Sequence, residues 1–168
     1  MSAQSLEQYL SSGVVAVSPI VDFNKSTDTL YPFDLTKNNT QLTEELFSNT
    51  TAFSRWIEQT LLETGSRYGI GGYNEHRTIY NRTQHFNTEE EPRTLHLGID
   101  IWGPAGTSVY APLHGLVHSF NNNDAFGDYG ATIILEHHYP FKFFTLFGHL
   151  SLNSIKDIFR GQPIKSGE

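Results

Sequence analysis

The sequence predicts a mainly β protein with an N-terminal α-helical extension, an α+β chain whose strands form an antiparallel sandwich or a partly open barrel. Residues 1–65 read as helices and turns, whereas short β-branched or aromatic runs separated by turn residues follow from residue 66. These runs recur about every 8–12 residues with little helix between them, which is typical of antiparallel sheet. We therefore expect a helical extension over 1–65 and a β-domain over 66–168.

Composition excludes several classes of function. The 168 residues carry 11 Lys plus Arg and 18 Asp plus Glu, a formal net charge of −7. We expect no nucleic-acid partner, because nucleic acids are bound by basic surfaces. There is no cysteine, so thiolate metal ligands and a cysteine nucleophile are excluded, and any transition-metal site must use His, Asp and Glu.

The same sequence gives no sign of a membrane or secretory segment. No apolar run approaches the roughly 20 residues that a bilayer span needs. The first dozen residues are polar and lack the basic region of a signal peptide. We expect a cytoplasmic protein without a membrane span.

Two helices are expected in the extension. Residues 2–11 are a short amphipathic candidate, and the stronger helix covers 49–63. Asn49 or one of the two threonines after it can cap this helix, and Gly65 supplies a stop. Its apolar side chains recur at helical spacing, which predicts a helix packed on a sheet rather than a partner-binding face. They are Phe53, Trp56, Ile57, Thr60 and Leu61.

The strands expected after residue 66 are short and lie between turn residues. Runs that fit a strand cover 107–111, 115–120, 131–136, 142–147 and 163–165, and residues 121–124 and 127–130 read as loops.

The most informative stretch is 95–102, where apolar residues alternate with His96, Gly98 and Asp100. In a strand this alternation puts these three on one face. Along a straight strand His96 and Asp100 would lie roughly 13 Å apart, too far for one ion. A bend, which Gly98 permits, would bring imidazole and carboxylate together as two ligands of a His/carboxylate zinc site. An ion pair or a buried hydrogen bond is the simpler interpretation.

A second histidine follows a predicted strand. Residues 142–147 lead into Gly148 and His149, and a histidine just past a strand end is well placed to act as a general base in a cleft. The alternative is a surface histidine at a strand–loop junction. His137 and His138 are expected to be exposed or structural.

Several of these blocks occur in a recognisable order. His96-x-Gly98-x-Asp100 is followed by residues 106–117, by Tyr129-Gly130 and by residues 145–151. This order resembles the LytM/lysostaphin-type zinc metallopeptidases, a family with the duplicated hybrid motif fold whose members cut peptide cross-links of bacterial cell walls. The resemblance covers residues 93–168.

A narrower resemblance reaches upstream, through Gly71-Gly72-Tyr73-Asn74-Glu75-x-Arg77-x-x-Tyr80. It is to a branch of the same family that is found beside kinase-like and aminotransferase domains in larger cytoplasmic proteins. A cytoplasmic location fits this branch, whereas the role of the wider family implies a wall-facing one.

The resemblance implies a zinc-dependent hydrolase of peptide or amide bonds that uses metal-activated water as the nucleophile. His96 and Asp100 match the first two zinc ligands, and His149 matches the first catalytic histidine. The implied cofactor is Zn²⁺ and the implied partner is a peptide or amide substrate.

The upstream block adds residues of less definite role. By analogy with latent relatives, Asn74 and Glu75 are candidates for an additional or site-occluding metal ligand. The alternative is that residues 71–80 form a structural turn that packs the helical part onto the sheet. Arg77 and Tyr80 are candidates for substrate binding, although Arg77 can equally pair with Glu75 or Asp100.

The sequence departs from the family at the third zinc ligand. That ligand is the second histidine of a His-x-His pair on a strand expected after residues 161–167, and no His-x-His occurs here. We therefore expect a β-domain that is C-terminally incomplete, with an unpaired sheet edge that favours self-association. The alternative function is a non-catalytic binding or scaffold module that keeps the peptidase fold. A carrier-like β-barrel is a third interpretation, which gives His96 and Asp100 no role.

Overall fold

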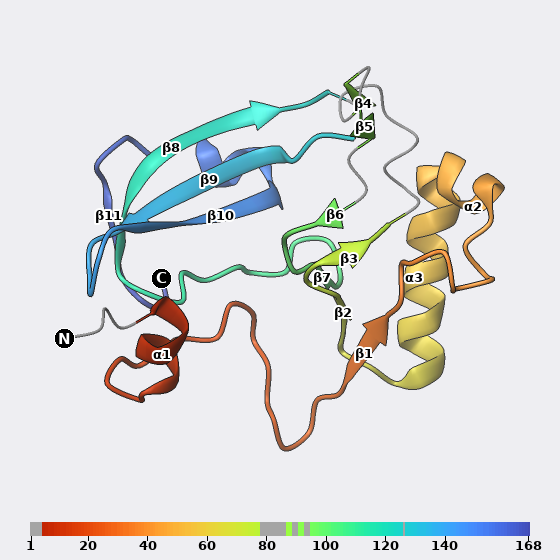
Figure 1. The fold of residues 1–168 in the computed structure, drawn as a ribbon, viewed down its shortest axis with the longest axis horizontal. Helices are drawn as coiled ribbons and strands as arrows, with labels where there is room; N and C mark the ends of the chain where they lie inside the picture. The colour runs from red at the N-terminus through yellow and green to blue at the C-terminus, as the bar shows by residue number, and fades with distance from the viewer. Residues whose placement is uncertain (1–4, 78–86, 89–90, 93–94, 126) are drawn as a thin grey trace. The chain divides into compact units, whose positions relative to one another are not determined.

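The computed structural model describes residues 5–77, 87–88, 91–92, 95–125 and 127–168. Its contacts divide the chain into two units, which are Asn24–Ala105 and the combination of Met1–Phe23 with Gly106–Glu168 (Figure 1). The α-helices of the described residues all lie in the first 65 positions, and strands dominate the remainder. The predicted fold class is therefore confirmed. The domain boundary expected at residue 66 stays a prediction.

The unit Asn24–Ala105 contains the helices α2 (Glu44–Ser48) and α3 (Thr50–Thr64). Asn49 caps α3, because its side chain accepts a hydrogen bond from the backbone N–H of Ala52 at 3.1 Å. Gly65 ends the helix in the left-handed region at φ 63°. Both predicted ends of this helix are confirmed.

A three-stranded sheet lies in the same unit, with the order β1 (Leu30–Phe33), β2 (Tyr68–Gly71), β7 (Ile101–Trp102). β1 runs parallel to β2, and β7 runs antiparallel to it. The expectation of helices and turns alone before residue 66 was wrong for β1. This strand is four residues long and contains a proline, which is tolerated at the edge of a sheet.

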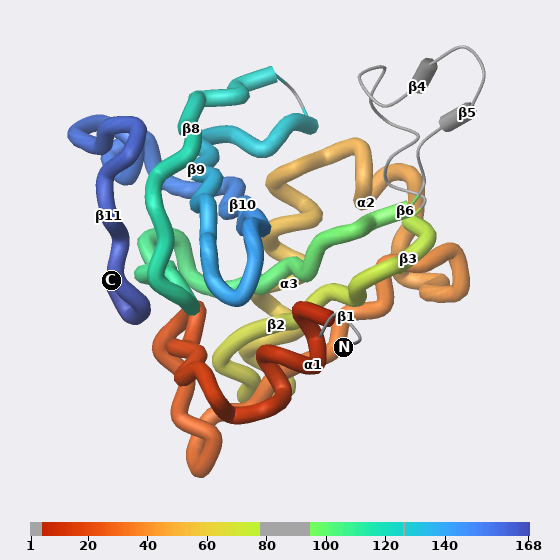
Figure 2. The backbone as a smooth tube through the Cα atoms, turned by 60° about the vertical axis from the view of Figure 1, so that its left-hand side comes forward, coloured from red at the N-terminus to blue at the C-terminus, as the bar shows by residue number. Residues whose placement is uncertain are grey.

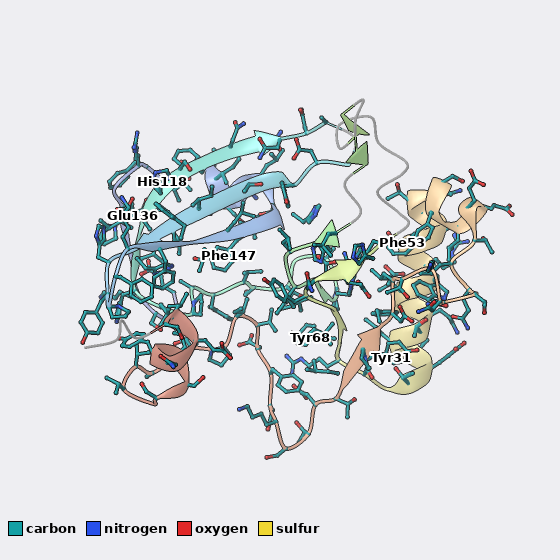
Figure 3. All side chains as sticks on the ribbon, viewed as in Figure 1. Tyr31, Phe53, Tyr68, His118, Glu136 and Phe147 are labelled. Carbon is teal, nitrogen blue, oxygen red and sulfur yellow. The ribbon has the colours of Figure 1, made fainter. Side chains whose placement is uncertain are left out.

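The predicted stripe of α3 faces this sheet. Phe53, Ile57 and Leu61 are buried in one cluster with residues from β1 and α2. Figure 3 labels Phe53 on α3 and Tyr31 on β1. The predicted packing of the helix on a sheet is confirmed. The buried members of the cluster are Phe33, Leu35, Phe47, Phe53, Ile57 and Leu61.

The predicted strand over 95–102 is divided into two short strands. β6 (Leu95–His96) pairs with β3 (Glu75–His76), and β7 pairs with β2. Residues 97–100 lie between them outside any strand, so the chain bends where the sequence predicts. The remaining pair of the unit joins β4 (Asn87–Thr88) to β5 (Glu91–Pro92).

The other unit is built on a curved antiparallel sheet (Figures 1 and 2). Its order is β10 (Phe143–Leu150), β9 (Gly130–His137), β8 (Gly115–Asn123), β11 (Pro163–Ile164). The short helix α1 (Leu6–Ser11) precedes it, with the N-cap at Ser5. Among the described helices, none is long and apolar enough to cross a membrane.

Two sequence expectations fail in this sheet. Residues 121–123, expected in a loop, belong to β8, because pairing with β9 extends as far as Asn123 opposite Gly130. Residues 107–111, expected as a strand, are not one. Their backbone is nevertheless bonded on two sides, since Tyr110 N–H donates to Ile20 O at 2.8 Å and Ala111 N–H donates to Glu168 O at 2.9 Å.

Gly69 tests how tightly the sheet of the Asn24–Ala105 unit is packed. A Cβ at this position would overlap the Phe33 ring in the buried cluster. We expect Gly69→Ala to lower the free energy of unfolding by about 1–3 kcal/mol, the usual cost of overpacking, as measured by urea unfolding. Gly72→Ala is the matched control, because its Cβ would lie 3.6 Å from the nearest side chain. Equal stability of the two variants would contradict this packing.

Candidate functional site

The bend at 97–100 brings the two predicted metal ligands together. His96 Nε2 lies 3.6 Å from Asp100 Oδ1, and both side chains are only partly exposed. Gly98 makes this possible by its size, since a Cβ there would lie 3.1 Å from His96 Nε2. Gly98 is not among the glycines at positive φ, so it provides room for the ring rather than an unusual backbone conformation.

The other ring nitrogen of His96 faces the main chain. Nδ1 lies 3.3 Å from the carbonyl oxygen of Gly72. A carbonyl only accepts, so in this contact Nδ1 carries the proton, and in the neutral ring Nε2 presents its lone pair. The carbonyl contact thus leaves Nε2 as the ring nitrogen nearest to Asp100.

Arg77 lies behind Asp100 and is 5% exposed. Its Nη1 donates to Asp100 Oδ2 at 2.5 Å, and its Nε donates to Glu75 Oε2 at 2.6 Å. Burial works against the charged guanidinium, but the carboxylates of Asp100 and Glu75 outweigh burial and raise the pKa of Arg77 above its ordinary value. The pairing of Arg77 that the sequence left open therefore involves both carboxylates.

Glu75 is held by the main chain as well as by Arg77. Its Oε1 accepts the backbone N–H of Leu35 at 3.0 Å, so both of its oxygens are engaged. Asn74 is exposed and adopts a positive φ of 58°. Tyr80 lies outside the described residues. The roles predicted for Asn74, Glu75, Arg77 and Tyr80 toward metal or substrate stay predictions.

His149 belongs to the other unit. The sequence predicted a position just past a strand end, which was wrong, because His149 lies within β10. The register between β10 and β9 shifts between Phe147 and Leu150, which is a β-bulge. His149 has a φ of 56°, and its N–H donates to Tyr129 O at 2.6 Å. Bulges redirect side chains, and this one leaves His149 exposed.

His137 and His138 differ sharply. His137 is 2% exposed and lies between the carbonyl of His114, at 2.7 Å from Nδ1, and Thr145 Oγ1, at 2.9 Å from Nε2. It is therefore a structural residue. His138 is exposed and lies 2.9 Å from Glu136.

Glu136 is the centre of a small charged group on the sheet, close to His118 (Figure 3). A hydrogen bond from Lys142 lowers the pKa of the Glu136 carboxyl below its ordinary value, against the opposing effect of burial. No group of three His, Cys, Asp or Glu residues that suits a metal ion occurs in the part of the chain that the structure describes.

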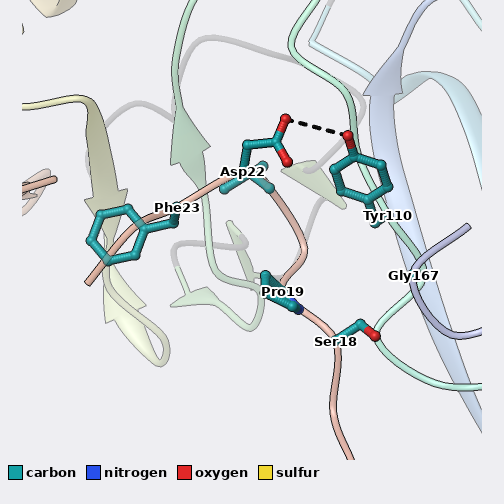
Figure 4. A pocket seen from close by; sticks show the side chains of 7 residues that line it. Ser18, Pro19, Asp22, Phe23, Tyr110 and Gly167 are labelled. Atoms are coloured by element: carbon teal, nitrogen blue, oxygen red, sulfur yellow. Dashed lines mark hydrogen bonds between the residues drawn. The ribbon is translucent and has the colours of Figure 1, made fainter. Parts of the chain in front are cut away.

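Two surface hollows lie among the described residues. One, of about 280 Å³, lies within the unit of the curved sheet beside Ser18, Pro19 and Tyr110 (Figure 4). Its carboxylate, Asp22, accepts the Tyr110 hydroxyl at 3.3 Å. The other, of about 270 Å³, is lined by residues of the Asn24–Ala105 unit, which are Pro32, Phe33, Ile70, Gly71, Gly72, Tyr73 and Ile99.

The C-terminal part of the chain has a recognisable relationship to known proteins. Residues 94–168 match the model of peptidase family M23. This segment, somewhat less than half of the chain, is therefore similar to that family. The M23 segment includes His96, Asp100 and His149, which confirms the LytM-type resemblance. No curated protein and no solved structure gives a significant match to the chain.

From the sequence, Glu75 and Asp100 were alternative partners of Arg77, and it was not predicted that both contact it at once. Glu75 and Arg77 are two positions apart, a spacing that puts side chains on one face of a strand. The contact of Arg77 with Asp100 spans 23 positions, and no local spacing favours it. The contact between the Gly72 carbonyl and His96 could not be predicted from the sequence either, because the carbonyl belongs to the backbone.

Gly98 offers a direct test of the His96–Asp100 geometry. We expect Gly98→Ala to displace the His96 ring from Asp100, because the new methyl group would lie 3.1 Å from Nε2 and must push the ring aside. Ring-nitrogen NMR shifts of His96 measure the displacement. Gly72→Ala is the control, because it keeps the carbonyl that contacts His96. Unchanged His96 shifts in Gly98→Ala would contradict the close approach.

Proposed function

We propose that this protein is a zinc-dependent hydrolase of peptide or amide bonds. The M23 segment supports a peptidase-family relationship and a peptide substrate. Within it, the carboxylate of Asp100 and the imidazole of His96 converge to 3.6 Å. Zinc, the cofactor implied by the family, favours nitrogen and oxygen ligands of this kind.

One observation carries the proposal. Nδ1 of His96 lies against the Gly72 carbonyl, so Nε2 is the ring nitrogen that faces Asp100 Oδ1, at 3.6 Å. Two acceptors that face each other repel unless a proton or a metal cation lies between them. The pair therefore accommodates either a shared proton, as in a His–Asp ion pair, or a metal cation, and our proposal takes the metal.

The spacing of the two groups also suits zinc. Zinc–nitrogen and zinc–oxygen bonds of about 2.0–2.2 Å at a tetrahedral angle separate two ligand atoms by roughly 3.4 Å, close to the 3.6 Å between Nε2 and Oδ1. The described residues supply these two ligands without a third. The residues present thus fit two positions of a zinc site.

The chain's own residues have separable roles in this proposal. Bound zinc lowers the pKa of a coordinated water and polarises a carbonyl group. His96 and Asp100 would hold the ion. His149, exposed at the bulge of β10, holds or delivers a proton as a general acid–base.

A second candidate function follows from the same ligand set. Because no group of three potential ligands occurs among the described residues, a non-catalytic binding module that keeps the peptidase fold is the alternative. The two functions differ in metal affinity, which is measurable without knowing the substrate.

Zinc titration of the full chain separates them. We expect zinc to raise the free energy of unfolding, by about 2.7 kcal/mol when free zinc is 100 times its dissociation constant. His96→Ala and Asp100→Asn should each abolish this gain, because each removes a ligand. His138→Ala is the control, since this exposed histidine lies in the other unit. Absence of any gain in the unmodified chain would favour the non-catalytic module.

His149 is tested by kinetics on peptide substrates. We expect His149→Asn to lower kcat by about 10²–10⁴ with unchanged zinc content, because it removes an acid–base group but no ligand. Asparagine tolerates the positive φ found at this position. His118→Asn is the matched control, since His118 also lies at a register shift in this sheet. Loss of zinc from His149→Asn would argue that His149 is a ligand.

A further inference from the structure

We infer that Arg77 is a positioning residue, which holds the Asp100 carboxylate so that one oxygen faces His96, and that Glu75 anchors Arg77 for this purpose. The inference rests on the proposed function, because it concerns how the chain prepares Asp100 for a cation. It assigns Glu75 a structural role in place of the site-occluding one considered from the sequence.

The two oxygens of Asp100 have different surroundings. Oδ2 accepts from Arg77 Nη1 at 2.5 Å, whereas Oδ1 faces His96 Nε2 at 3.6 Å. The main chain of the same residue is held as well, because the N–H of Gly71 donates to Asp100 O at 2.9 Å. The carboxylate is thus fixed at its backbone and at one oxygen, which leaves the other oxygen directed at the imidazole.

Arg77 is itself held in place. Its Nε bonds to Glu75, whose second oxygen accepts the backbone N–H of Leu35. Leu35 is 1% exposed and belongs to the buried cluster of the unit. The guanidinium is therefore tied to the hydrophobic core through Glu75, and a planar donor group of this kind loses little freedom when it bonds two carboxylates.

Gly71 provides the room that this arrangement needs. A Cβ at position 71 would lie 2.8 Å from Arg77 Nη2 and 3.2 Å from Asp100 Cβ. Nη2 is buried and, among the described residues, has no hydrogen-bond partner. Leaving one buried donor unsatisfied has an energetic cost. We attribute this cost to the placement of Arg77 against Asp100.

The charges around Asp100 favour this role over competition with a metal. A guanidinium next to a metal-binding carboxylate would by itself repel a cation. Glu75, however, neutralises Arg77, so the three groups together keep one net negative charge, which Asp100 presents toward His96. Partners of ligating side chains commonly change metal affinity by about 10–100-fold when they are removed.

Cobalt binding to the full chain tests the inference, because Co²⁺ has a visible absorption that reports ligand geometry. We expect Arg77→Met to weaken Co²⁺ binding by about 10–100-fold. Arg77→Lys should weaken it as well, since one ammonium group cannot reproduce the two-sided contact of the guanidinium. Should Arg77→Met fail to fold by circular dichroism, Arg77→Lys, which keeps the buried charge, carries the test.

Arg67→Met is the matched control. Arg67 also forms an arginine–carboxylate pair in this unit, with Asp28 at 2.8 Å, but its side chain is 45% exposed. We expect its cobalt affinity to equal that of the unmodified chain. Unchanged affinity in the Arg77 variants would overturn the inference, and tighter binding in Arg77→Met would show instead that Arg77 competes with the metal for Asp100.

A measurement without metal separates this inference from the proposed function. If Asp100 turns away from His96 when Arg77 is replaced, the ring-nitrogen NMR shift of His96 Nε2 should move in metal-free Arg77→Lys and stay constant in Arg67→Met. If neither the unmodified chain nor any variant binds cobalt, the proposed zinc-dependent function is wrong. The His96 shifts in the metal-free proteins still test the positioning role of Arg77. An unmoved Nε2 shift overturns that role.

Discussion

The contact of Arg77 with Glu75 and Asp100 is the interaction on which the candidate site depends. It joins the segment after β1, the strand β3 and the bend before β7, three stretches that are far apart in the sequence. Ion pairs of this degree of burial are weak evidence for stability, because desolvation opposes the attraction between the charges. Their value lies in geometry, since removing one partner leaves a buried charge and a carboxylate without a fixed direction.

Small residues matter in this site as much as charged ones. Gly71 leaves space for the guanidinium beside Asp100, and Gly98 leaves space for the ring of His96. Neither glycine has a positive φ, so their role is the close approach of neighbouring groups rather than backbone conformation. The polar groups of the site can approach one another because positions 71 and 98 carry no side chain.

Much of the local structure was predictable because its causes are local. Asn49 and Gly65 delimit α3, and the alternation and turn residues after 114 locate β9 and β10. The bend that joins His96 to Asp100 followed from the distance along a straight strand. β1 was missed because its pairing with β2 is long-range, and the end of β8 was misplaced because pairing with β9 overrides the loop character of three asparagines.

The candidate site was predictable only where the sequence pattern or the family resemblance identifies a side chain. His96, Asp100 and His149 carry motifs that are visible in the sequence, and the M23 match covers all three. The orientation of those groups was not visible, because it depends on a backbone carbonyl at Gly72 and on contacts made across 23 positions. The bulge that exposes His149 likewise depends on the register between two strands.

The aromatic core of the Asn24–Ala105 unit has a practical consequence for spectroscopy. The chain contains two tryptophans, and both Trp56 and Trp102 pack against Phe33 and Phe53 in that core. Emission excited selectively from indole therefore reports on the packing of this core. The unit that carries His96 and Asp100 thus has a built-in optical reporter, whereas the other must be followed through tyrosine or backbone signals.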